Sequence, residues 1–384
     1  MCRLTSPALP PETGHKGQPM SESNNDLSTS QTGDNCSGLN QASSHEHATS
    51  KPGQDLSLEQ LHLDLLKPVA ETKMQAWLSE FYGKEVEIVE REVLRHRDLS
   101  RVERLVFRDA LPASLIYKQV LPPWDVEQDL HERILIPSIS NSPQLFMAAH
   151  SGQVTAMLME DLGPVNLLTY IENEPTAKVS QVAHNLGEEL AKMHRSYSYR
   201  TDELMPLGIL RSLSPIDYET TARSLADSLS AWHLGDGDKL DSVVKLAALI
   251  AEELADEPIS LTHGDLYAEN IILRHDKLFL IDWSWFSMLS VPLVDLATVT
   301  MTHQKNGAFA GYAATVIEAY CFESGRDEAK VREKLPYAEA LSRVLFLDWL
   351  VERKERGIEG TTVGPVNNLI EVVLDELKAR RHAL

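Results

Sequence analysis

The chain has 384 residues, enough for one large domain or for two to three smaller ones. Its 57 Asp and Glu residues against 36 Lys and Arg residues give a formal net charge of −21, which argues against duplex nucleic acid and anionic membranes as partners. No apolar run approaches the roughly 18 residues of a membrane span, and three cysteines are too few and too scattered for a disulfide framework or a zinc site. We therefore expect a cytoplasmic protein; the composition does not indicate an oligomeric state.

Residues 1–56 differ in composition from the rest of the chain. They contain no Val, Ile, Phe, Tyr or Trp and are rich in Ser, Thr, Asn, Gln, Gly and Pro. Such a segment cannot bury enough apolar surface to offset the entropy of ordering it, so we expect a disordered tail. The tail holds three basic and six acidic residues. Most of the negative charge therefore belongs to the part that folds.

Two helices are expected at the start of that part. Leu58, Leu61 and Leu65 recur at helical spacing, and a second helix is expected to open at Pro68 and to end before Gly83.

Strand-like runs follow, with short apolar segments or alternation of apolar and charged residues. The expected strands are Glu85–Val89, Val102–Phe107, Leu115–Leu121, Gln144–Ala148 and Thr155–Met159. Between the third and the fourth strand, over Asp125–Ile139, the apolar period lengthens to that of a helix. This order predicts a small antiparallel sheet that carries one helix.

The pattern becomes helical after Asp161–Pro164, with a long apolar stripe over Val182–Met193. We therefore expect an α+β protein with a small N-terminal lobe over residues 57–160 and a larger, mainly helical lobe over residues 161–384. The hinge between them is placed near residue 160.

The candidate catalytic and metal-binding residues lie in the segment from residue 261 to residue 282. Asp265 and Asn270 lie in a predicted loop, and a hairpin that turns at Arg274–Lys277 then delivers Asp282 at the end of its second strand. Mg²⁺ prefers one or two carboxylates together with substrate phosphate oxygens, which suits Asp282 and Asn270. Asp265 is left to orient a hydroxyl nucleophile and to accept its proton, the usual division of roles in phosphoryl transfer.

These motifs resemble the aminoglycoside phosphotransferase/choline kinase family of the protein-kinase-like superfamily. The resemblance rests on H-G-D-x-x-x-x-N at residues 263–270, I-D-W at 281–283, D-L-A at 295–297 and L-A-x-x-H at 190–194. It implies a two-lobed protein-kinase-like fold with a small antiparallel-sheet N-lobe. It also implies an enzyme that moves the γ-phosphate of ATP or GTP, with Mg²⁺, to a hydroxyl of a small molecule.

The resemblance also assigns roles in the N-lobe. Lys118 is expected to bind the α- and β-phosphates and to pair with Glu132 on the following helix, although Glu127 lies on the same predicted helix. The backbone at Glu160 and Leu162 is expected to hold the adenine base.

The loop between the first two strands, near residues 95–101, contains no glycine, which weakens its ability to bring backbone amides close to phosphate. Ser100 in this loop is a candidate phosphate contact.

Other residues near the motifs receive supporting roles. We expect His263 to brace the catalytic loop, Asp295 to accept hydrogen bonds from its backbone amides, and His194 to serve in packing. Trp283, Trp285 and Phe286 are expected in the core.

The acceptor is left open. Acidic residues of the helical lobe could attract a cationic acceptor such as an aminoglycoside or an amino alcohol, and the candidates are Glu172, Glu174, Asp217, Glu219 and Asp348, the last beside Trp349. A solvated acidic surface is the simpler interpretation of these residues. An inactive nucleotide-binding module is the alternative function, and a protein kinase is disfavoured because Gly264 replaces the usual arginine and no D-F-G or A-P-E element is present.

Overall fold

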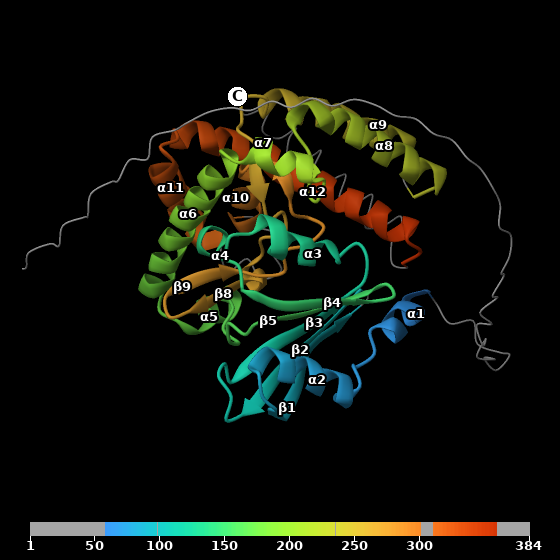
Figure 1. Cartoon of the computed structure of the whole chain (residues 1–384). Helices are drawn as coiled ribbons and strands as arrows, with labels where there is room; N and C mark the ends of the chain where they lie inside the picture. The colour runs from blue at the N-terminus through green and yellow to red at the C-terminus, as the bar shows by residue number, and fades with distance from the viewer. Residues whose placement is uncertain (1–57, 98, 235, 301–309, 359–384) are drawn as a thin grey trace, which may run out of the picture. The chain divides into compact units, whose positions relative to one another are not determined.

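The structure is a computed structural model that describes residues 58–97, 99–234, 236–300 and 310–358. These residues belong to one compact unit. The expected disordered tail, residues 1–56, lies outside the described residues. Within the described ranges, a sheet dominates up to Glu160 and helices dominate after it (Figure 1).

Five strands of the described N-terminal part form one antiparallel sheet in the order β1-β2-β3-β5-β4. The strands are β1 (Glu87–Arg97), β2 (Ser100–Arg108), β3 (Ser114–Val120), β4 (Leu145–Ser151) and β5 (Val154–Glu160). The predicted succession of three strands, a helix and two further strands in a small antiparallel sheet is confirmed. The first strand, however, extends to Arg97, well beyond its predicted end at Val89. It is an edge strand that pairs with β2, and an edge strand tolerates the charged residues that make this stretch look like a loop.

The predicted helix over Asp125–Ile139 is present but broken. It consists of α3 (Val126–Asp129), a π-helical turn η1 (Leu130–Ile134) and α4 (Pro137–Ser140). The break precedes Pro137, because the residue before a proline avoids helical dihedral angles, and Ile136 is extended at φ −108° and ψ 108°.

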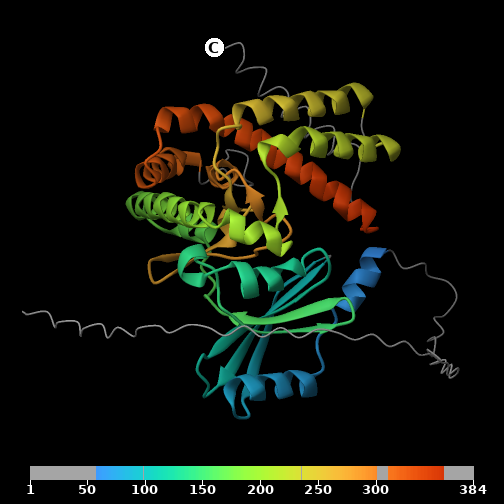
Figure 2. The ribbon, with the colours of Figure 1, turned by 45° about the horizontal axis from the view of Figure 1, so that its top comes forward.

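The two faces of the sheet have different neighbours. Helix α2 (Glu71–Tyr82), which follows α1 (Leu58–Leu65), lies on one face, where its Met74 and Leu78 are buried with Leu105 and Phe107 of β2. Figures 1 and 2 place α3 on the opposite face. Helix α2 starts at Glu71, later than the predicted start at Pro68, and ends as predicted at Gly83, which adopts the left-handed conformation at φ +64°.

The C-terminal lobe consists of helices around short strands. Its helices are α5 (Leu167–Asn173), α6 (Thr176–Ser198), α7 (Thr201–Leu204), η2 (Met205–Leu207), η3 (Pro215–Asp217), α8 (Tyr218–Ala231), α9 (Gly237–Glu253), η4 (Ala268–Asn270), α10 (Leu293–Thr300), η5 (Ala310–Tyr312), α11 (Ala313–Ser324) and α12 (Glu328–Glu355). Its strands are β6 (Arg211–Ser212), β7 (Ser260–Thr262) and β10 (Met288–Ser290), in the order β6-β10-β7, and the predicted hairpin β8 (Ile271–Arg274) and β9 (Lys277–Leu280). In the parts of the chain that the structure covers, no helix is long and apolar enough to cross a membrane.

Close packing in this lobe fixes the helices behind the catalytic loop. The predicted apolar stripe of α6 is buried, and a Cβ atom at Gly187 would lie 2.3 Å from the carbonyl oxygen of Val316 in α11. Glycine therefore lets the two helix backbones approach each other.

Candidate active site

The loop between β7 and η4 presents Asp265 through a turn that requires glycine. Gly264 has a φ of +76°, and a Cβ atom there would lie 2.2 Å from the carbonyl oxygen of Phe286. A side chain would be strained and would also collide with backbone. Asn270 then ties the loop together, because its Nδ2 donates to the backbone oxygen of Asp265 at 2.8 Å and to its Oδ2 at 3.2 Å.

A fully buried carboxylate holds this loop from behind. Oδ2 of Asp295 accepts a hydrogen bond from the backbone N–H of His263 at 2.8 Å, and Oδ1 accepts one from Gly264 at 2.7 Å. Burial alone would raise the pKa of Asp295, but the hydrogen bond and charge of His194 and the contacts with His263 hold it below its ordinary value. The prediction that Asp295 binds the loop amides is confirmed.

Two histidines complete this support. His263 Nε2 donates to the carbonyl oxygen of Ile281 at 2.9 Å and so links the loop to the residue before Asp282; the predicted brace is confirmed. Burial lowers the pKa of His263, so the ring is neutral near pH 7. The expectation that His194 serves in packing is incomplete, because its ring contacts Asp295 at 3.1 Å and the hydroxyl of Tyr320 at 3.2 Å.

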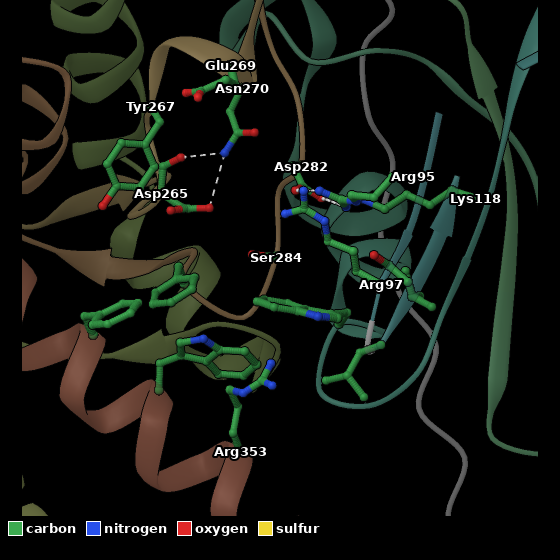
Figure 3. A pocket seen from close by; sticks show the side chains of 17 residues that line it. Arg95, Arg97, Lys118, Asp265, Tyr267, Glu269, Asn270, Asp282, Ser284 and Arg353 are labelled. Atoms are coloured by element: carbon green, nitrogen blue, oxygen red, sulfur yellow. Dashed lines mark hydrogen bonds and ion pairs between the residues drawn. The ribbon is translucent and has the colours of Figure 1, made fainter. Parts of the chain in front are cut away.

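Asp282 lies at the centre of the charged groups. It follows β9 with a φ of +65°, an unusual conformation for a residue other than glycine. Its Oδ1 lies 2.6 Å from Lys118 Nζ, and its Oδ2 lies 3.0 Å from Arg95 Nη1 (Figure 3). Burial opposes ionisation of Asp282, but the positive charges of Lys118 and Arg95 outweigh it and hold the pKa well below its ordinary value.

The helical partner of Lys118 is Glu127, and the prediction of Glu132 is wrong. Glu127 is buried, and its Oε2 lies 2.5 Å from Lys118 Nζ. Glu132 is exposed and accepts a hydrogen bond from Gln128 at 2.9 Å. Five residues correspond to about 140° around a helix, so Glu127 and Glu132 cannot both face the sheet.

The turn before Ser100 differs from a glycine-rich phosphate loop. Arg97 already pairs with Ser100, so the turn comprises residues 98 and 99, of which Asp98 lies outside the described residues. Leu99 is buried in an apolar cluster with Phe286 and Trp349 of the C-terminal lobe. Ser100 is buried too, and it lines the adjoining cavity.

Two cavities meet at Asp282. A cavity of about 420 Å³ lies between the sheet and the hinge, where Ile116, Met159 and Ile272 supply apolar walls and Glu160 and Leu162 form part of the rim. The side chain of Glu160 accepts a hydrogen bond from Arg274 Nη1 at 2.7 Å.

A second cavity, of about 740 Å³, is also lined by Asp282 (Figure 3). The residues common to both cavities are Arg95, Lys118, Glu269, Asn270 and Asp282. These shared residues include the charged and amide groups predicted for phosphate and metal, so the cavities join at the point where those groups converge.

The residues that line the larger cavity differ from those predicted. Phe286 lines it together with Trp124 and Trp349, so Phe286 is more than a core residue, whereas Trp283 is fully buried as predicted. Of the acidic candidates, Asp348 contacts Arg211 at 2.5 Å. The remaining candidates, Glu172, Glu174, Asp217 and Glu219, do not line the cavity as far as the described residues define it. Its carboxylates are those of Asp265, Glu269 and Asp282.

The donor set suits a magnesium ion. Asp282 supplies a carboxylate and Asn270 an amide oxygen, and their segments are joined by a hydrogen bond of 2.9 Å from Ile281 N to Asn270 O. The described residues contain no cluster of three or more His, Cys, Asp and Glu side chains that could hold a metal. Two protein oxygens, completed by phosphate and water, are the usual ligands of Mg²⁺ rather than of a structural metal, so the residues fit the predicted ion.

Sequence reasoning missed Arg95, Tyr267 and Glu269, which line the larger cavity, and it named Trp349 only as the neighbour of Asp348. Tyr267 and Glu269 occupy variable positions of the H-G-D-x-x-x-x-N motif. Their place in the chain between Asp265 and Asn270 is the signal that could have identified them. Arg95 was hidden by the prediction of a loop where β1 continues.

Comparison with known proteins agrees with this geometry. The model of the phosphotransferase enzyme family matches residues 130–333. Protein LicA of Haemophilus influenzae is 27% identical over 224 residues, which cover 56% of this chain and 79% of the relative.

Two solved structures share the fold. The choline kinase LicA from Streptococcus pneumoniae has a TM-score of 0.54 at 15% identity, over 80% of this chain and 99% of that one. The aminoglycoside phosphotransferase APH(2'')-Ib, solved with ADP, has a TM-score of 0.52 at 15% identity, over 79% and 97%. The predicted two-lobed α+β fold is confirmed.

Proposed function

The chain belongs to the phosphotransferase enzyme family and is a small-molecule kinase; from that premise we propose that it transfers the γ-phosphate of ATP or GTP to the hydroxyl of an amino alcohol or an aminoglycoside-like amine. The observation that carries this proposal is the convergence of Asp265, Asn270, Asp282 and Lys118 where a nucleotide-sized cavity meets a larger one. Nothing favours the alternative of an inactive nucleotide-binding module.

Asp265 is the proposed catalytic base. Its carboxylate lines the larger cavity, where an acceptor hydroxyl can reach it. Burial, reinforced by the nearby charge of Asp282, raises the pKa of Asp265 to about 7. A group that titrates near the working pH can take a proton from the acceptor hydroxyl as the bond to phosphorus forms. The hydrogen bonds from Asn270 fix the direction of the carboxylate.

The nucleotide is proposed to lie with its base in the smaller cavity. Ile116, Met159 and Ile272 offer apolar contact to a flat ring, and the backbone of Glu160 and Leu162 supplies the hydrogen bonds. APH(2'')-Ib, which has this fold, was solved with ADP. The phosphates would then extend toward Lys118, which Glu127 holds in place. The nearby carboxylates of Asp282 and Glu127 outweigh the effect of burial and keep the pKa of this lysine above its ordinary value, so Lys118 is charged.

Asp282 and Asn270 are the residues that would hold Mg²⁺. When bound, the ion supplies positive charge to the transferring phosphate oxygens. Asp282 is ionised at any pH near neutrality and is therefore ready to ligate. Asp295 accepts hydrogen bonds from the backbone of the catalytic loop and so keeps Asp265 and Asn270 of this loop at a fixed separation from Asp282.

An aromatic wall supports the choice of a cationic acceptor. The rings of Trp124 and Trp349 lie 4.6 Å apart, and Phe286 lies 5.7 Å from Trp349. These rings share the larger cavity with the carboxylates of Asp265 and Glu269. Aromatic faces beside carboxylates suit an ammonium group. The kinases with this fold include one for choline and one for aminoglycosides.

The test measures the release of ADP from ATP, or of GDP from GTP, in the presence of Mg²⁺ with choline, ethanolamine and several aminoglycosides as acceptors, and with neutral sugars as controls. We expect turnover with at least one amine-bearing alcohol and none with the neutral sugars. Turnover with neutral sugars alone would contradict the acceptor class, and the absence of both ADP and GDP release with every acceptor would contradict the proposed activity.

A further inference from the structure

Arg95 and Lys118 lie in one row across the sheet. Arg95 of β1 pairs with Val102 of β2, and Val102 pairs with Lys118 of β3. All three residues line the smaller cavity, so the row faces the nucleotide side of the sheet. Figure 3 shows both cationic side chains directed at Asp282.

The two cations engage both oxygens of Asp282. Arg95 Nη1 donates to Oδ2 at 3.0 Å and its Nη2 donates to Oδ1 at 3.3 Å, a two-pronged contact. Lys118 donates to Oδ1 at 2.6 Å. The carboxylate that should ligate a metal is therefore held by the protein's own cations.

A metal ion cannot join this arrangement without a change. It needs an oxygen of Asp282 and is repelled by a guanidinium at the same atom. Oδ2 contacts Arg95, whereas Lys118 has a second carboxylate, that of Glu127, to keep it in place. The contact that must give way is therefore the one made by Arg95.

The released guanidinium would need a new anion. Only 35% of the Arg95 side chain is exposed, and its Nε is buried with no hydrogen-bond partner among the described residues, so leaving the guanidinium unpaired would carry a desolvation cost. It lines both cavities at their junction, which is where the phosphates of a bound nucleotide would lie.

The turn next to Arg95 lacks a good phosphate-binding group, which a guanidinium could supply. Residues 95–101 contain no glycine, and Leu99 fixes the turn to Phe286 and Trp349. Backbone amides of this turn are therefore poorly suited to surround a phosphate. A guanidinium offers several N–H donors in a fork that matches phosphate oxygens.

We propose that Arg95 occupies Asp282 in the nucleotide-free protein and moves to the β- and γ-phosphate oxygens when a metal nucleotide binds. This inference rests on the proposed nucleotide-binding function. Arg95 thus takes the role that backbone amides have in a glycine-rich loop, and it also competes with the metal for Asp282.

The experiment compares the wild type with Arg95→Met and Arg95→Lys. Arg108→Met is the matched control, because Arg108 is an exposed arginine of the same sheet. Electron paramagnetic resonance measures Mn²⁺ binding to the nucleotide-free protein. Calorimetry measures the binding of AMP, ADP and a non-hydrolysable ATP analogue in the presence of Mg²⁺, and thermal unfolding checks that each variant is folded.

For Arg95→Met we expect Mn²⁺ to bind several-fold more tightly, because Asp282 is freed. We expect the affinity for ADP and for the ATP analogue to fall about tenfold or more, while the affinity for AMP changes little. Arg95→Lys should lie between the wild type and Arg95→Met, and it replaces the latter if the methionine variant does not fold. Arg108→Met should match the wild type.

The opposite directions of the two effects separate this role from a merely structural one. Unchanged Mn²⁺ affinity, or an equal loss for AMP and the ATP analogue, would overturn the inference. A wild-type protein that binds none of these nucleotides would contradict the proposed function instead. If the wild type binds nucleotide and Arg95→Met has the wild-type affinities for Mn²⁺ and for the nucleotides, the inference about Arg95 is contradicted and the proposed function is not.

Discussion

Lys118 Nζ lies 2.5 Å from the carboxylate of Glu127, and both side chains are buried against the sheet. Removing one partner of a buried ion pair leaves the other poorly placed. We expect Glu127→Gln to lower kcat/KM for ATP about tenfold or more, the scale of a lost charged hydrogen bond. Glu132→Gln is the matched control on the same helical segment and should leave kcat/KM unchanged. Equal losses for the two variants would contradict the assignment of Glu127.

Gly264 is expected to be indispensable for the catalytic turn. Gly264→Ala combines the strain of a φ of +76° with a contact of 2.2 Å to the carbonyl oxygen of Phe286. We expect it to lower the free energy of unfolding by about 2–4 kcal/mol and to abolish most activity. Gly83→Ala serves as the control, because Gly83 has a φ of +64° with nothing near its Cβ position. Urea unfolding of both variants isolates the collision from the strain, and equal losses would show that no collision occurs.

Asp295 should make stability depend on pH. Its pKa is depressed in the folded protein, so the carboxylate contributes fully above the unfolded-state pKa of about 4. This contribution is lost as the pH falls through the lower, folded-state value. We expect Asp295→Asn to cost about 3 kcal/mol at pH 7, and the difference from the wild type to shrink as the pH falls below about 4.

Urea unfolding of the wild type and Asp295→Asn at a series of pH values measures this difference. The exposed pair of Glu87 with Arg108 supplies a control, since Glu87→Gln should cost under about 1 kcal/mol. A difference for Asp295→Asn that grows on acidification would show that the folded-state pKa is raised, contrary to our account.

Trp349 is expected to act on the acceptor rather than on the nucleotide. Its ring lines the larger cavity beside Trp124 and Phe286. Trp349→Leu should raise KM for the acceptor about tenfold, the scale of a desolvated cation–π contact with its lost packing, and should leave KM for ATP within about twofold. Trp232→Leu is the control, because Trp232 does not line this cavity. Steady-state kinetics with each substrate varied would decide, and a rise confined to KM for ATP would contradict the assignment.

The architecture and the catalytic loop could be predicted from the sequence because both depend on local patterns of residues. The positions of the strands along the chain follow from apolar alternation and turn residues, and Asp265, Asn270 and Asp282 follow from one short motif and a hairpin. Glu127 could not be separated from Glu132, since that choice depends on which side of a broken helix faces Lys118. Arg95 was not predicted as a site residue for a related reason. A charged edge strand looks like a loop until its pairing with β2 is known.

The central claim is phosphoryl transfer to an alcohol with Asp265 as base. The most direct measurement is ³¹P NMR of the products formed from ATP, Mg²⁺ and choline, or the best acceptor of the panel, by the wild type and by Asp265→Asn. The account predicts a phosphomonoester of the acceptor hydroxyl with the wild type. With Asp265→Asn it predicts loss of this product by about a hundredfold or more, together with retained nucleotide binding. Release of inorganic phosphate without a phosphorylated acceptor, or a variant as active as the wild type, would contradict it.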